Sequence, residues 1–182
     1  MSELNQRWGQ PLGLQGGRTG LSSFDIYGMG KFISVAAITT STVWPAANLA
    51  IFVPFSLDSE TLIAQLWWFN GATVAGNVDI GIYTADGTRL LSAGSTAQSG
   101  TSVLQSVNTA DTLVGPGVYY LALALSDGTA TISGRTLAAL QHGQIAGMAE
   151  KTSAFALPAT VTLASLTGLF CPAMGVVGKE TL

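Results

Sequence analysis

The feature that most limits the fold is a series of short segments in which apolar and other residues alternate between turn residues. In NVDIGIYTADGTRLLSAG, which begins at Asn77, every second residue from Val78 to Ile82 is apolar. Such alternation is typical of a strand with one buried face. The Asp86-Gly87 pair that follows supplies the positive φ that a tight hairpin turn requires. This stretch therefore predicts two antiparallel strands joined by a turn.

Several other segments of the same kind surround this hairpin. They read KFISVAAITTSTVW, NLAIFVPFSL, TLIAQLWWFN, TSVLQSVN and VYYLALAL. Pro54 indicates a sheet edge or a bulge, because proline cannot donate to a ladder. Asp127-Gly128 repeats the Asp-Gly-Thr device of the first hairpin and precedes another short strand. Strands at this spacing predict an all-β fold, an antiparallel jelly-roll β-sandwich over residues 31–135.

The two ends of the chain differ from the sandwich in composition. Residues 1–30 are rich in glycine and show no period, so we expect an extended N-terminal arm. This arm also carries large apolar side chains that a free linker would not need, and we expect them to anchor it on a neighbouring subunit: Trp8, Leu12, Leu14 and Leu21.

Residues 136–182 predict a long loop or second arm, then a closing strand and tail, packing on the sandwich or on a neighbouring subunit. The spacing of Leu137, Leu140 and Ile145 allows a single helical turn. Glycines at positions 143 and 147 weaken that turn, which favours the loop.

The surface that this fold leaves is unusually poor in charge. Charged residues make up 9% of the 182 residues, against roughly 25% in an average soluble domain. A surface of small, neutral residues favours burial against other subunits, so we expect a symmetric homo-oligomer. A lightly charged secreted binding module is the alternative. A pI near 4.8 and seven scattered Lys and Arg residues indicate neither nucleic-acid nor membrane binding. The first ten residues lack the apolar core of a secretory signal, so we expect synthesis in the cytoplasm.

Residues that could carry chemistry are few. His142 is the single histidine and Cys171 the single cysteine, which leaves no conventional metal cluster and no disulfide. Cys171 has no cationic neighbour in the sequence to lower its pKa. The glycine clusters lack the spacing of a phosphate-binding loop. We therefore expect no catalytic residues, no metal and no cofactor, and the chain is predicted not to be an enzyme.

Two groups of side chains are candidates for contacts with a ligand or with another subunit. Asp79 lies within a strand beside Tyr83, where a solvent-facing position is the default and a glycan or ion contact is the functional alternative. Trp67, Trp68 and Tyr119 are interpreted as core or interface aromatics. A stacking platform for sugar rings is the alternative for these rings, although adjacent residues of a strand point to opposite faces.

The hairpin and the later stretch GPGVYYLALALSDGTATISG together resemble the β-sandwich modules of minor virion proteins in tailed bacteriophages. The resemblance covers roughly residues 48–135 and brings no site residues with it. Such modules are similar to carbohydrate-binding jelly rolls and serve as head decorations, head fibres, or tail and baseplate parts. The resemblance implies a structural protein located in the virion that binds other capsid or tail proteins. The alternative that it implies is an adhesion module for host-surface glycans.

Overall fold

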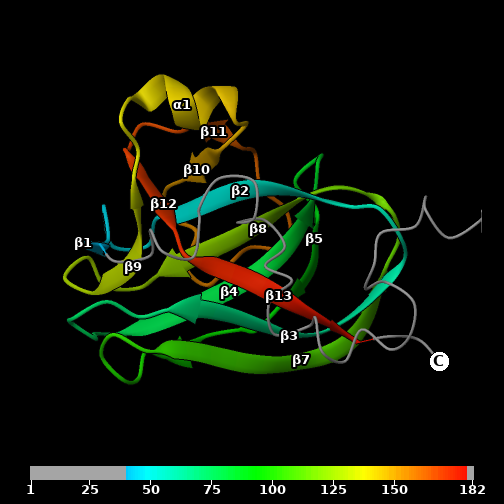
Figure 1. Cartoon of the computed structure of the whole chain (residues 1–182), viewed down its shortest axis with the longest axis horizontal. Helices are drawn as coiled ribbons and strands as arrows, with labels where there is room; N and C mark the ends of the chain where they lie inside the picture. Colours follow the sequence, from blue (N-terminus) through cyan, green and yellow to red (C-terminus); the bar gives the residue numbers. More distant parts are fainter. Residues whose placement is uncertain (1–39, 180–182) are drawn as a thin grey trace, which may run out of the picture.

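The structure, a computed structural model, describes residues 40–179. Within this range the chain forms thirteen strands and one short helix (Figure 1). The first nine residues of the expected sandwich, 31–39, lie outside the described range. So does the expected N-terminal arm with its four expected anchors, Trp8, Leu12, Leu14 and Leu21.

The largest sheet contains seven antiparallel strands. Its order is β11-β10-β2-β8-β4-β5, and β6 pairs with the beginning of β4. Its strands are β2 (Ala50–Leu57), β4 (Asn77–Thr84), β5 (Arg89–Ser92), β6 (Thr96–Ala97), β8 (Gly117–Leu125), β10 (Ala149–Lys151) and β11 (Ala164–Ser165).

Two three-stranded sheets complete the fold. One has the order β13-β3-β7 and consists of β3 (Thr61–Phe69), β7 (Leu104–Val114) and β13 (Met174–Lys179). The other has the order β1-β9-β12 and consists of β1 (Thr40–Val43), β9 (Thr131–Thr136) and β12 (Phe170–Pro172). Between β2 and β8 the chain changes sheet at β2 to β3, β3 to β4, β6 to β7 and β7 to β8. The prediction of an antiparallel all-β sandwich is confirmed, and the jelly-roll topology stays a prediction.

The main core lies between the sheets and contains side chains from all three. Trp68 of β3 is fully buried there, and its indole Nε1 donates to Asn70 Oδ1 at 2.7 Å. Trp44, which follows β1, is also buried and donates through Nε1 to the carbonyl of Leu49 at 3.0 Å. Both indoles therefore bury their ring area without leaving a donor unsatisfied.

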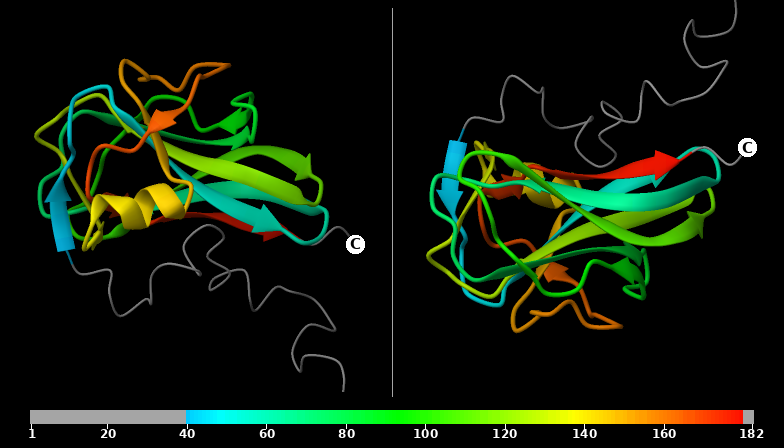
Figure 2. Two further views of the ribbon diagram at one scale, coloured as in Figure 1. Left: turned by 90° about the horizontal axis from the view of Figure 1, so that it is seen from above. Right: turned by 90° about the horizontal axis from the view of Figure 1, so that it is seen from below.

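A second apolar cluster lies on the other face of the seven-stranded sheet. Phe52 of β2 and the small Ala122 and Ala124 of β8 contribute to it, together with Leu157 and Val161. Figure 2 shows the segment around residue 160, in orange, and β13, in red, on opposite sides of the molecule. The central strands of the largest sheet are thus covered on both faces, which explains their nearly continuous apolar sequence.

Residues 136–179 pack on the sandwich, and the part expected as a long loop, 136–159, contains a helical turn and a short strand. Each sheet gains strands from this part of the chain: β10 pairs with β2, β12 with β9 and β13 with β3. The short helix α1 (Leu140–Ile145) spans the region where glycines argued against a helical turn. Gly143 is buried in α1, where a Cβ would lie 2.6 Å from a methyl of Leu166. The glycine therefore serves close packing of the helix.

The two Asp-Gly-Thr turns are not equivalent. Around Gly87, with φ +88°, β4 and β5 form the expected hairpin. Asp127 also accepts a bond from the Thr129 amide, at 2.6 Å, but the chain then leaves β8 for another sheet. The predicted second hairpin is therefore wrong.

Pro54 lies in β2, in the middle of the seven-stranded sheet. It is paired with Tyr120 of β8, whereas β10 covers only Ala50–Phe52 on the other side. The proline thus occupies a stretch with one open side, as its missing donor requires.

In the described part of the chain, no helix has the length and apolarity needed to cross a membrane.

Candidate functional site

Asp79 and Tyr83 are both buried, so the solvent-facing position expected for this face of β4 is wrong. Neither side chain is exposed to any measurable extent. They lie beneath residues 154–161, named here the covering segment. Asp79 accepts hydrogen bonds from Ser92 Oγ at 2.7 Å and from the Leu157 amide at 2.9 Å. The carboxylate holds two parts of the chain together, and its position does not favour a glycan contact.

Further bonds fasten the covering segment to the β4–β5 hairpin. Tyr83 donates its hydroxyl to the carbonyl of Pro158 at 2.6 Å. The Arg89 guanidinium donates to the carbonyl of Leu157, and the Arg89 amide to that of Ala159 at 2.9 Å. The Val161 amide closes the far end on the carbonyl of Gly87 at 2.9 Å. The β4–β5 hairpin therefore anchors the covering segment, which lies far from it in the sequence.

Burial changes the chemistry of Tyr83. Loss of water raises the pKa of its phenol to about 12, and the nearby Asp79 carboxylate acts in the same direction. The Arg89 guanidinium partly opposes this shift. At neutral pH Tyr83 is therefore a neutral donor, suited to holding the Pro158 carbonyl and not to proton transfer.

The aromatic residues do not assemble a sugar-binding platform in the described part of the chain, where every aromatic side chain is buried or half-buried. Trp68 lies in the core. Trp67 points to the other face of β3, where its ring is so close to Gly175 that a Cβ there would lie 2.5 Å from ring carbons. Tyr119 is half-buried against Phe55, with ring centroids 5.9 Å apart.

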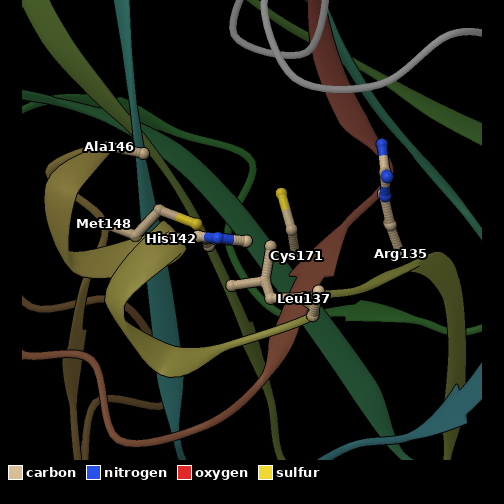
Figure 3. Close-up of a pocket in the computed structure, with 7 residues that line it drawn as sticks. Arg135, Leu137, His142, Ala146, Met148 and Cys171 are labelled. Atoms are coloured by element: carbon tan, nitrogen blue, oxygen red, sulfur yellow. The ribbon is translucent and has the colours of Figure 1, made fainter.

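A cavity of about 240 Å³ lies beside α1 (Figure 3). Leu137, Ala146, Met148 and Cys171 line it, together with Arg135 and His142. His142 is an exposed residue of α1 whose ring points toward Cys171 (Figure 3), and no carboxylate belongs to the lining.

Cys171 of β12 is buried and lines this cavity. Burial raises the pKa of its thiol to about 12, only partly opposed by the Arg135 charge. At neutral pH the sulfur is therefore protonated and a poor nucleophile. Residues 40–179 also contain no group of three or more His, Cys, Asp and Glu side chains able to hold a metal. The side chains around the cavity provide apolar contact area and no evident acid–base pair.

A further candidate for contacts is the outer edge of β7. This strand is eleven residues long and, among the described residues, pairs only with β3. Its first half, Leu104 to Asn108, pairs with Phe69 to Gln65 without irregularity, and a bulge follows. A sheet edge of this kind presents a row of backbone donors and acceptors to another chain.

The side chains of this edge are also suited to association. Leu104 and Leu113 are 54% and 51% exposed. No charged residue occurs between Arg89 and Asp111, and β7 contains neither lysine nor proline. Natural edge strands commonly use such residues to prevent pairing. The sequence predicted a short strand here, but it gave no sign that the strand would lie at an edge, because that depends on which strands pair.

Comparison with protein families gave no matching family model, and neither the curated proteins nor the solved structures gave a match.

Proposed function

We propose that this chain is a structural protein of a bacteriophage particle, a head decoration, fibre or tail-associated component that forms a symmetric oligomer and attaches to other virion proteins. The proposal of assembly rests on the exposed edge of β7. This strand is long, its first half is uncharged, and exposed leucines lie near both of its ends. The phage assignment is supported by the resemblance of residues 48–135 to virion sandwich modules.

Pairing at this edge would proceed by strand addition. A second copy that approaches β7 around a twofold axis extends the β13-β3-β7 sheet through backbone hydrogen bonds. The exposed leucines are then removed from water, which contributes roughly 25 cal/mol for each Å² of apolar surface buried. Six strands would form one continuous sheet across such a dimer.

The virion location can be tested directly. Peptide mass spectrometry of purified phage particles, washed at high salt, should detect this chain in a fixed ratio to the major capsid protein. Its presence in the lysate but not in the particles would refute the assignment.

The arm is tested by shortening the chain. A version that starts at Lys31 should form a smaller fraction of oligomer or attach less to particles. The reason is that the arm is proposed to anchor on neighbouring subunits through Trp8, Leu12, Leu14 and Leu21. The same oligomeric state in solution and equal incorporation into particles for both versions would contradict this role.

A host-glycan-binding module is the competing function. It receives no support from residues 40–179, because their aromatic side chains are buried or half-buried and both carboxylate oxygens of Asp79 accept hydrogen bonds inside the protein. Saturable binding of a surface glycan, lost in Tyr119→Ala, would reverse this preference.

A further inference from the structure

The loop before β7 and the first residue of that strand have little apolar packing to hold them. Residues 99–104, named here the leading segment, are all exposed, and Val103 and Leu104 are 45% and 54% exposed. Leu104 is also the first residue of the straight half of the β7 edge. Burial of apolar side chains supplies most of the free energy that fixes a chain segment. The leading segment therefore depends on other contacts for its position.

Three side-chain amides provide these contacts and are named here the amide cluster: Asn70, Gln98 and Gln105. Asn70 follows β3 and is fully buried, and Gln98 is 8% exposed. Asn70 Nδ2 donates to the carbonyl of Ser99 at 2.7 Å and to Gln105 Oε1 at 2.9 Å. Asn70 Oδ1 accepts from Trp68 Nε1 at 2.7 Å and from Gln98 Nε2 at 3.0 Å. Both donors and both acceptor positions of this amide are therefore used.

Gln105 joins the beginning of β7 to the same cluster. Its Oε1 also accepts from the Ser99 amide at 2.8 Å, and its Nε2 donates to the carbonyl of Ala97 in β6 at 2.9 Å. At the other end of the leading segment, the backbone amide of Asn70 donates to the carbonyl of Val103 at 2.9 Å. The leading segment is thus bonded to Asn70 near both of its ends.

The amide cluster is anchored on a second sheet. Gln98 Nε2 also donates to the carbonyl of Thr131 in β9 at 3.0 Å, and Gln98 Oε1 accepts from the Ala75 amide at 2.9 Å. Ser133 of β9 donates its hydroxyl to the carbonyl of Asn70 at 3.0 Å. These bonds fix the leading segment relative to β9, which belongs to a different sheet from β7.

We propose that the amide cluster positions the beginning of β7 for pairing with a second copy of this chain. The inference rests on the proposed assembly through β7 and names the residues that keep this edge ready for it. Strand addition uses a row of backbone donors and acceptors, and a segment that is already fixed loses less conformational entropy when it pairs. Without the cluster, the exposed leading segment would lose its attachments and β7 would fray from Leu104.

Gln105→Met tests this role in the full-length chain, because it removes three side-chain hydrogen bonds and adds no charge. Gln65→Met is the matched control in the neighbouring strand β3. Gln65 is half-buried, and its amide donates to Asn108 Oδ1 at the surface, outside the leading segment.

Hydrogen exchange at Ser102 measures the position of the leading segment. The Ser102 amide donates to the carbonyl of Gly71 at 2.8 Å, a bond that Gln105→Met does not remove directly. Loss of one hydrogen bond shifts an opening equilibrium roughly fivefold, so the loss of three should make this amide exchange at least about ten times faster. Gln65→Met should leave its exchange within about twofold of the unaltered chain.

Sedimentation over a range of concentrations measures the effect on assembly. Gln105→Met should raise the concentration needed for association at least about tenfold, because the frayed edge must be ordered again on pairing. Asp79→Ala, which removes buried hydrogen bonds outside the amide cluster, is the control for lowered stability and should leave association unchanged at temperatures where the chain is folded.

The two measurements separate this inference from the proposed function. Unchanged exchange at Ser102 in Gln105→Met would overturn the placement of the leading segment by the cluster, whatever the oligomeric state. Faster exchange with unchanged association, or an equal loss of association in Asp79→Ala, would overturn the role of the cluster in assembly. A monomeric unaltered chain would overturn pairing through β7 itself, and exchange at Ser102 would still decide whether the cluster places the segment.

Discussion

Replacing Asp79 by alanine should loosen the covering segment and destabilise the whole sandwich. The substitution removes both acceptors from a fully buried position. The Leu157 amide, bonded at 2.9 Å, then has no acceptor, while Ser92 is only half-buried and can bond water. The first loss is larger because an unsatisfied buried donor keeps its full desolvation penalty.

The magnitude follows from these two bonds. The orphaned Leu157 amide costs about 2 kcal/mol and the weakened Ser92 bond about 1 kcal/mol. Removal of a buried carboxylate returns part of this, so a net loss of about 2 kcal/mol is expected. For a chain of this length that corresponds to a Tm lower by roughly 4–8 °C. Asp79→Asn should cost about 1 kcal/mol, because an amide can still accept from Leu157 and donate to Ser92.

Thermal unfolding by circular dichroism measures the global effect, and hydrogen exchange at Leu157 the local one. Asp58→Ala, at an exposed carboxylate between β2 and β3, is the control for loss of a negative charge. If Asp79→Ala unfolds within 1 °C of the control and the Leu157 amide keeps its protection, Asp79 is not the fastening point inferred from the structure.

Three further results are expected. Stabilisation by the buried neutral phenol of Tyr83 should be complete below pH 10, where folded and unfolded chains both keep the proton, and should be lost between pH 10 and about 12. Denaturant unfolding measured across this window should show that the free energy of unfolding falls by up to roughly 3 kcal/mol, and this fall should be absent in Tyr83→Phe. Cys171, with a pKa near 12, should react with a thiol reagent at pH 8 at least 100-fold more slowly than in denaturant, and equal rates would place the thiol at the surface. Gly87→Ala should lower the free energy of unfolding by more than about 2 kcal/mol, because its Cβ would lie 2.1 Å from the Val161 carbonyl oxygen. Gly94→Ala, with φ +73° but open space around it, should cost only about 1 kcal/mol of backbone strain. Similar losses for the two variants would argue against close contact of Gly87 with the covering segment.

The features that were predictable from the sequence are local ones. The β4–β5 hairpin depends on the alternation from Val78 to Ile82 and on a glycine that adopts positive φ at position 87. Both are written in adjacent residues. The class of the fold followed for the same reason, because many short segments with period two and turn residues between them fit only an all-β architecture.

The positions that sequence reasoning missed depend on distant partners. Asp79 seemed solvent-facing because a carboxylate within a strand usually is, yet its acceptor bond reaches Leu157, 78 residues later. The alternation of small residues at Ala122 and Ala124 was the available signal that something packs closely on that face. The failed second hairpin has the same origin, since Asp127 makes the local bond to Thr129 whichever sheet the next strand joins.

For the exposed edge of β7, only the low charge was predictable from the sequence. Low charge indicated that part of the surface is buried against other subunits, but β7 was one short strand among several. Among residues 40–179 it lies at an edge because it pairs with β3 alone, and pairing is decided by contacts across the whole chain.

The mass of the full-length chain in solution, measured by sedimentation over a range of concentrations, tests the central claim most directly. The chain should sediment as a discrete multiple of 18.7 kDa. Ser106→Lys, which places a charge in the straight half of β7, should shift it toward the monomer, while Thr101→Lys, at an exposed site before the strand, should not. A monomeric full-length chain, or an oligomer that Ser106→Lys leaves intact, would contradict assembly through β7.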